Sequence, residues 1–238
     1  MANIQFPTQT GQKVANIWNS DHALADEGSF FTACNPTPLT VIAATASVVD
    51  DAQTASATHA CYSPMFYIAN TASPSDLNGK SIYLKYLRLK MGVSATFTSA
   101  SDWCYTIRAD NVARYTSGGS AITPKNVNTG ISTASVAQIY AGALVCANLP
   151  SSSHRLLSHG QVEAAIPVVK AQYTFTFGDT TMPNSILTAT GVKNMNVACP
   201  PIVIAPGWNI YFGMFGTANA GTPQLEFEWG FAERISGQ

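Results

Sequence analysis

The sequence predicts an all-β fold, a jelly-roll-like β-sandwich with an N-terminal arm. Short runs rich in β-branched and aromatic residues follow one another from Thr32 onward, and clusters of Pro, Gly, Asn and Ser separate them. This series of short runs contains no long helical pattern and no repeat of fixed period. About nine or ten such runs are typical of a β-sandwich, and eight core strands in two sheets would make it a jelly roll. We expect an arm or short helix over residues 1–30 and one β-sandwich domain over residues 31–238.

The first 30 residues hold the only helical signal. Val14, Ile17, Trp18 and Leu24 fall near the spacing of about 3.6 residues that a helix requires. The segment also suits an extended arm on a neighbouring subunit, because its apolar residues, Phe6 included, precede the first convincing strand. The alternative is a lid that folds back over one end of the sandwich.

The later runs are expected to form strands. In chain order they are 39–49, 63–69, 81–92, 103–109, a short run at Arg114–Tyr115, 135–147, 161–170, 171–178, 196–204, 209–215 and 224–231. The run 81–92 alternates most clearly, with Ile82 and Leu84 on one face and Leu87, Leu89 and Met91 on the other. In the last run, Leu225, Phe227, Trp229 and Phe231 share a face opposite Glu226 and Glu228.

Composition excludes several functions. Charged residues make up 11% of the chain, against about 25% in an ordinary domain. The net charge of −1 does not indicate the basic surface that binds nucleic acid. No apolar run reaches the length of about 18 residues that a membrane span needs. Five widely spaced cysteines and an N-terminus unlike a secretion signal predict unpaired, buried thiols in a protein made in a reducing cytoplasm. A surface with so little charge favours assembly.

Motifs that would carry chemistry are weak. The Gly-Lys-Ser at residues 79–81 lacks the first glycine of a phosphate loop, and an Asn-Gly hairpin turn is the better interpretation. His154 and His159 are expected in a loop. Glu226 and Glu228 would project from one face about 7 Å apart, as paired carboxylates of a glycosidase can, but a solvated or interface face is favoured. We expect no catalytic residue, no metal and no cofactor, and therefore no enzyme.

Two stretches are more informative. The first contains Arg114-Tyr115-Thr-Ser-Gly-Gly and continues to Pro124-Lys-Asn126-Val-Asn128. The second runs from Pro200-Pro-Ile-Val-Ile-Ala-Pro-Gly-Trp208 to Phe227-Glu-Trp-Gly-Phe-Ala-Glu-Arg234. Together they resemble a group of tailed-bacteriophage virion proteins that share an RYxSGG…P.N.N loop and an ending of the form PVxIxPG…ExxW/GxxER. The resemblance covers mainly residues 108–130 and 200–234, about a quarter of the chain.

The resemblance implies a jelly-roll head decoration or cement protein on the phage particle, made in the host bacterial cytoplasm. Its partners would be the major capsid protein and further copies of the chain, and a trimer would fit the local three-fold positions of an icosahedral shell. The alternatives are a receptor- or carbohydrate-binding module of a tail fibre or spike, and a jelly-roll capsid protein. The candidate interface residues are Phe6, Ile17, Trp18, Leu24, Arg114, Tyr115 and Trp208.

Overall fold

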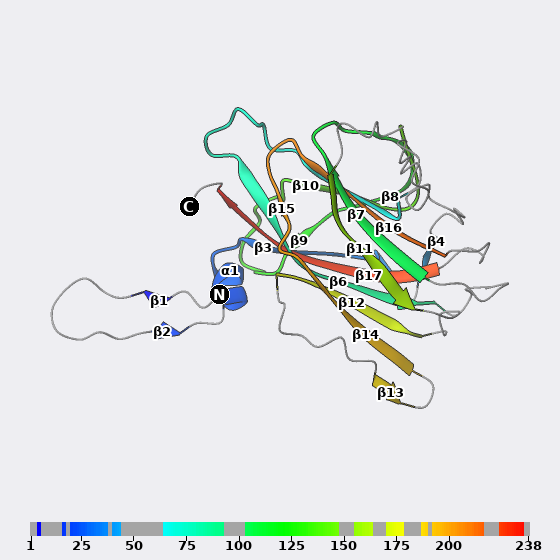
Figure 1. Cartoon of the computed structure of the whole chain (residues 1–238). Helices are drawn as coiled ribbons and strands as arrows, with labels where there is room; N and C mark the ends of the chain where they lie inside the picture. The colour runs from blue at the N-terminus through cyan, green and yellow to red at the C-terminus, as the bar shows by residue number, and fades with distance from the viewer. Residues whose placement is uncertain are drawn as a thin grey trace.

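The computed structural model is a sandwich of two β-sheets with one short helix (Figure 1). It describes residues 4–5, 16–17, 20–37, 40–43, 64–92, 103–147, 155–163, 170–178, 187–189, 192–216 and 224–235. All statements below concern these residues.

The larger sheet has nine strands. Its main path is β13 (Leu187–Ala189), β14 (Val192–Cys199), β12 (Gln172–Phe177), β6 (Lys80–Met91), β17 (Gln224–Ile235), β3 (Phe30–Cys34) and β9 (Lys125–Asn126), with β15 (Val203–Ile204) on β6 and β4 (Ile42–Ala43) on β17. The six-stranded sheet runs β11 (Arg155–Glu163), β7 (Trp103–Asp110), β16 (Asn209–Gly216), β5 (Phe66–Asn70), β10 (Ala137–Cys146) and β8 (Tyr115–Ile122).

The strand order is that of a jelly roll. Within the larger sheet the neighbours β3, β17, β6 and β12 pair antiparallel, and within the smaller sheet β5, β16, β7 and β11 do the same. In chain order these eight strands alternate between the sheets except at β7 and β11, which follow each other in the smaller sheet, and the last strands lie between the first ones. The predicted fold class is therefore confirmed. Strands β13 and β14 extend one sheet, and β8 and β10 extend the other.

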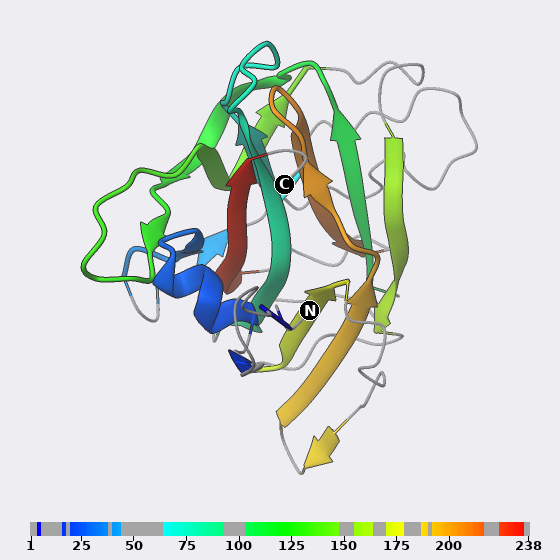
Figure 2. The same cartoon turned by 90° about the vertical axis from the view of Figure 1, so that its left-hand side faces the viewer.

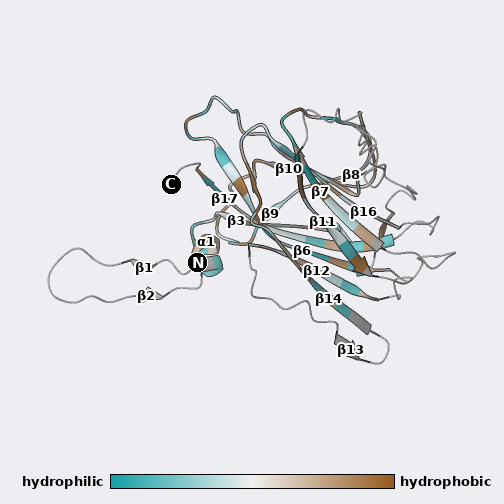
Figure 3. Cartoon of the chain, viewed as in Figure 1, coloured by the Kyte–Doolittle hydropathy of each residue, from teal (hydrophilic) through white to brown (hydrophobic). Residues whose placement is uncertain are grey.

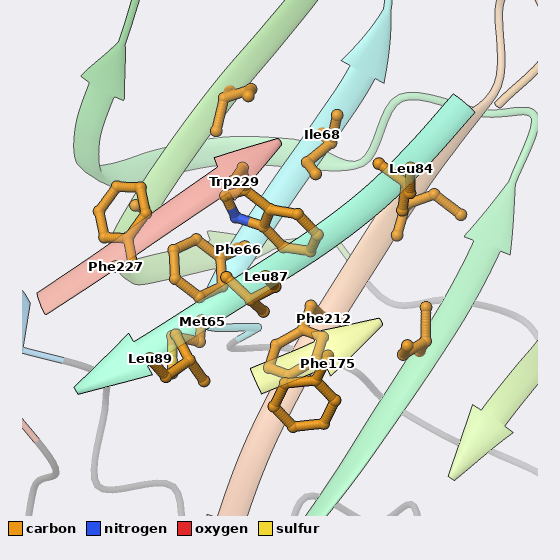
Figure 4. Packing of buried hydrophobic residues seen from close by; sticks show 14 of the residues in the cluster. Met65, Phe66, Ile68, Leu84, Leu87, Leu89, Phe175, Phe212, Phe227 and Trp229 are labelled. Carbon is orange, nitrogen blue, oxygen red and sulfur yellow. The ribbon is translucent and has the colours of Figure 1, made fainter. Parts of the chain in front are cut away.

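The core lies between the sheets and is rich in aromatic rings (Figure 4). Phe66 on β5 lies 4.8 Å from Phe227 and 5.6 Å from Trp229, both on β17, measured between ring centroids. Phe212 on β16 lies 5.1 Å from Phe175 on β12. These edge-to-face contacts join the two sheets and are worth about 0.5–1.5 kcal/mol each beyond their buried area. Hydrophobic and hydrophilic residues are interspersed along the strands of both sheets (Figure 3).

A β-bulge changes the expected faces of β6. Gly230 of β17 pairs with Tyr86, and the next residue, Phe231, pairs with Leu84, so that Lys85 is left as the extra residue. The bulge brings Ile82 and Leu84 to the same core as Leu87, Leu89 and Met91. The prediction that they occupy opposite faces is wrong, because strict alternation holds only on each side of the bulge. The shared face of Leu225, Phe227, Trp229 and Phe231 is confirmed.

The segment between β7 and β11 bridges the edges of the two sheets. Strand β8 pairs with β10 at one end of the smaller sheet, and β9 then pairs with β3 in the larger sheet. Asn126 Nδ2 donates to the carbonyl of Gly28 (2.8 Å), and Asn128 Nδ2 donates to the carbonyl of Asp26 (3.2 Å). The asparagines of the mid-chain stretch thus fix this bridge against the end of the helix.

Several local predictions need correction. The turn at residues 73–79 forms no hairpin, because the strands it joins, β5 and β6, lie in different sheets. His159 lies in β11 rather than in a loop, and the expected strand 161–170 begins earlier, at Arg155. The expected strand 196–204 is interrupted after Cys199, and β3 was not expected at all. Of the expected strand 39–49, residues 40–43 are described and contain β4; His154 lies outside the described residues.

The N-terminal region contains two structures. Helix α1 (Ser20–Asp26) lies beside β17 and β6 (Figure 2), where Leu24 packs with Phe30 and Ala232. Strands β1 (Ile4–Gln5) and β2 (Asn16–Ile17) pair with each other as a separate two-stranded sheet to one side of the sandwich (Figure 1). Among the described residues no helix has the length and apolarity needed to cross a membrane.

Candidate functional site

The outer face of the smaller sheet carries a cluster of tyrosines. Tyr67, Tyr115, Tyr140 and Tyr211 come from β5, β8, β10 and β16, and Leu144 and Cys146 pack among them. The rings of Tyr115 and Tyr140 stack with centroids 4.0 Å apart, and Tyr67 lies 5.3 Å from Tyr211. Tyr67 and Tyr211 are buried, whereas Tyr115 and Tyr140 are half-buried and reach the surface. We call these four tyrosines the tyrosine patch.

Hydrogen bonds tie the patch to the loop after β7. The Tyr211 hydroxyl donates to the carbonyl of Val112 (3.1 Å) and accepts from the Arg114 backbone N–H (3.3 Å). The Arg114 guanidinium in turn lies 2.8 Å from the buried carboxylate of Asp110. Val112 belongs to this loop, and its side chain is exposed, at 46%. The patch is thus a rigid surface that joins aromatic rings to an ion pair.

Burial keeps the patch chemically inert. Removal from water raises the pKa of Tyr67 and Tyr211, because a phenolate is costly in an apolar environment. It raises the pKa of the Cys146 thiol to about 12. These groups are therefore neutral near pH 7, and the patch is suited to contact rather than to acid–base or nucleophilic chemistry.

The structure distributes the predicted interface residues over several places. Arg114 and Tyr115 adjoin each other at the tyrosine patch. Trp208 is half-buried, packs against the main core and lies under the Arg155 guanidinium, 4.6 Å from the ring centroid. Leu24 is 8% exposed and packs with Phe30 and Ala232 within the chain. Phe6, Trp18 and the side chain of Ile17 lie outside the described residues.

The outer face of the larger sheet contains a hollow of about 300 Å³. Four charged side chains line it: Arg88 and Lys90 on β6, and Glu226 and Glu228 on β17. The strand register places Glu226 directly opposite Lys90, and Glu228 directly opposite Arg88. Cys34, Asn35, Leu89, Gln172, Thr174 and Phe227 complete the lining. We call this site the charged hollow.

The charges of the hollow pair across the two strands. Lys90 Nζ lies 3.3 and 3.4 Å from the two carboxylate oxygens of Glu226, and Arg88 Nη1 lies 3.5 Å from Glu228 Oε2. The Tyr86 hydroxyl donates to Glu228 Oε1 (2.5 Å), and burial followed by this hydrogen bond raises the pKa of Tyr86. The predicted shared face of the two glutamates is thus present, and each carboxylate has a cationic partner.

This arrangement suits binding better than proton transfer. A glycosidase needs two carboxyl groups that face the substrate on either side of the scissile bond, whereas here each carboxylate is paired with a cationic side chain of the neighbouring strand. No group of three or more His, Cys, Asp or Glu side chains in the described ranges is placed to hold a metal ion. Cys34, Cys146 and Cys199 are free thiols, but Cys34 is exposed, contrary to the prediction of burial.

Sequence reasoning recognised parts of the hollow but could not assemble it. Alternation placed Glu226 and Glu228 on one face, and the basic residues of β6 alternate in the same way. Neither pattern reveals that β6 and β17 are neighbours, because their paired residues are more than 130 positions apart. The contributions of Cys34 and Thr174 carry no local signal.

Comparison with known proteins adds little. No known family matches the chain, and no curated protein does. Among solved structures, the chain is similar to an unassembled KI polyomavirus VP1 pentamer, with 16% identity over 88% of this chain and 93% of that chain and a TM-score of 0.25. A score this low carries no inference about function.

Proposed function

We propose that this chain is a structural subunit of a virus particle, a bacteriophage head decoration or cement protein that binds the major capsid protein and further copies of itself. Jelly rolls form viral capsid domains, but also lectins and cupins, so the fold alone does not decide. Support comes from the two stretches that resemble phage virion proteins, from the low charge and from the N-terminal strands.

The observation that carries the proposal is the separate pairing of β1 and β2. Ile4 pairs with Ile17 and Gln5 with Asn16, and in the described part of the chain neither strand joins one of the large sheets. An isolated two-stranded ribbon is marginally stable in water. A second molecule that packs against this ribbon would stabilise it. We therefore assign it to the contact with a neighbouring copy or with the shell.

Self-association is the second part of the proposal. The chain has 12 basic and 13 acidic residues among 238, so its surface has little charge to repel another copy. The half-buried tyrosines offer rigid aromatic area of the kind enriched at protein interfaces. A trimer fits the local three-fold positions of an icosahedral lattice.

Deletion of residues 2–18 tests the role of the ribbon. We expect the truncated protein to melt at the temperature of the full chain, because α1 and both large sheets remain. It should sediment as a monomer and no longer bind purified particles. Analytical ultracentrifugation and co-sedimentation with phage heads measure both effects.

Deletion of residues 2–28 is the matched comparison. This longer truncation removes α1 and the contacts of Leu24, and it should lower the melting temperature. Loss of monomer stability in the shorter truncation would show that the ribbon belongs to the folded core and would contradict its role as an arm. Closed shells formed by the chain alone would identify a capsid subunit instead of a decoration protein.

A further inference from the structure

The charged hollow has hydrogen-bonding capacity that its own residues do not use. Charge-assisted hydrogen bonds are usually about 2.7–2.9 Å long. Elsewhere in the chain, Arg114 and Asp110 reach such a distance, at 2.8 Å, and Lys85 and Asp21 come close to it, at 3.0 Å. The pairs of the hollow are looser, at 3.3 to 3.5 Å. Their donors and acceptors can therefore turn to a ligand at small cost.

Donors and acceptors lie side by side in the hollow. The acceptors Glu226 and Glu228 stand on β17, and the donors Lys90 and Arg88 stand on the adjacent β6, about 4.8 Å away. On the far side of β6, Gln172 of β12 lies opposite Lys90, and Thr174 lies opposite Arg88. Both carry groups that donate and accept. A ligand thus meets alternating donors and acceptors across three strands.

The net charge of the hollow selects the class of ligand. The charges of two carboxylates and two cations cancel, so the hollow has no net positive potential that would attract a polyanion such as nucleic acid. A single anion would be attracted by the cations and repelled by the carboxylates. A hydroxyl group both donates and accepts, and a sugar presents several of them without charge. Alternating carboxylates and cations can bind such hydroxyls from both sides.

The backbone around the hollow is held in place before any ligand binds. The floor of the hollow is formed by paired strands, and Glu228 is held by Tyr86. At one side, Asn35 Nδ2 donates to the Thr40 carbonyl (2.7 Å), and Asn35 Oδ1 accepts from the Phe227 backbone N–H (2.5 Å). The volume of about 300 Å³ lies at the lower limit of the range of small-molecule sites, about 300–1,000 Å³. From these observations we propose that the charged hollow binds a neutral saccharide, a single sugar or the end of a short glycan.

Binding to an array of neutral glycans tests the proposal, with sialylated glycans on the same array. We expect the full-length protein to bind neutral members. Titration of the best one by NMR should show at least a tenfold loss of affinity in Lys90→Met and in Glu228→Gln, which keep side-chain volume but change charge. Lys85→Met is the control, because Lys85 lies on the same strand and pairs with Asp21 outside the hollow. It should bind as the unmodified chain does.

Alkylation of Cys34 gives a second readout. Cys34 lines the hollow and is the exposed one among the described cysteines. Saturating glycan should slow its reaction with a maleimide at least fivefold, measured at this residue by mass spectrometry, and Lys90→Met should remove the protection. Circular dichroism on each variant identifies any that fail to fold.

Three results would overturn the proposal: no neutral glycan bound at millimolar concentration, binding confined to sialylated glycans, or binding unchanged in both hollow variants. The outcome is independent of the proposed virion function, because assembly and particle binding are measured on the same variants. A subunit that assembles but binds no sugar would refute this inference alone.

Discussion

Gly230 shows how one residue sets the shape of the larger sheet. It lies opposite Tyr86, next to the bulge, and the Tyr86 ring covers it. A Cβ at this position would come within 2.2 Å of Tyr86 Cε1. The ring cannot move freely, because its hydroxyl is bonded to Glu228 and its face lies 4.7 Å from the Arg88 guanidinium. Glycine is therefore required by close packing at this position.

We predict that Gly230→Ala lowers the free energy of unfolding by about 1–3 kcal/mol, the usual range for overpacking. Urea denaturation followed by tryptophan fluorescence measures it. Gly130→Ala is the control: its Cβ would meet only Asn128 Oδ1, at 3.3 Å, and we expect a change within about 0.5 kcal/mol. Equal stability of the two variants would contradict the role of the Tyr86 ring.

Among the elements, the segment between β9 and β10 depends on a buried carboxylate. Glu233 on β17 is 1% exposed, and its Oε1 accepts hydrogen bonds from the Ser135 hydroxyl and from the Val136 backbone N–H (2.9 Å). Its other oxygen is buried without a hydrogen-bond partner. Burial raises the pKa of Glu233 above its ordinary value of 4.5, although these hydrogen bonds oppose the rise. Glu233 thus anchors the segment between β9 and β10 to the larger sheet.

This raised pKa predicts how stability depends on pH. The folded state binds the proton of the Glu233 carboxyl more tightly than the unfolded state does, so this proton stabilises the fold. Its contribution to the free energy of unfolding is complete below pH 4.5, the ordinary pKa, and is lost as the pH rises through the raised pKa of the folded state. Glu233→Gln stays neutral at all pH values and keeps an acceptor for Ser135 and Val136. We expect the variant to be more stable than the natural chain at pH 8, with a difference that shrinks toward pH 4. Thermal melts of both proteins between pH 4 and pH 8 measure this difference in stability. A difference that does not change with pH would refute the raised pKa of Glu233 as its cause.

At the scale of the whole molecule, the tyrosine patch and the β1–β2 ribbon offer two separate contacts. The ribbon extends to one side of the sandwich, and the patch covers the outside of the smaller sheet. A subunit with two contact regions can use both in the same assembly, against neighbouring copies and against the shell. Loss of either contact should then weaken assembly without unfolding the chain.

We predict that Val112→Lys, beside the patch, weakens self-association at least tenfold, because it would bury a charge in the contact. Val203→Lys is the matched control, since Val203 is 49% exposed against 46% for Val112 but lies on β15 in the other sheet. Sedimentation equilibrium measures both variants. Equal association constants would exclude the patch from the interface.

Much of the fold could be predicted because its signals are local. The sequence pattern identified the strands 103–109 and 209–215 to within one residue, and it located the start of the last strand but ended it four residues early, at 231. Turn residues such as Pro206–Gly207 marked the breaks. The shared face of Leu225, Phe227, Trp229 and Phe231 follows from the two-residue period of a strand. The sequence by itself therefore determined the β class, most strands and the aromatic side of the last strand.

Only the tertiary structure decided which strands are neighbours. The bulge at Lys85 depends on the fit of Tyr86 over Gly230, and the charged hollow depends on β6, β17 and β12 lying in register. Residues as far apart as Tyr86 and Glu228 meet there, and neither local propensity nor alternation records such a partner. The physical reason is that side-chain direction is a property of one strand, whereas pairing depends on how the apolar faces of all strands are buried together.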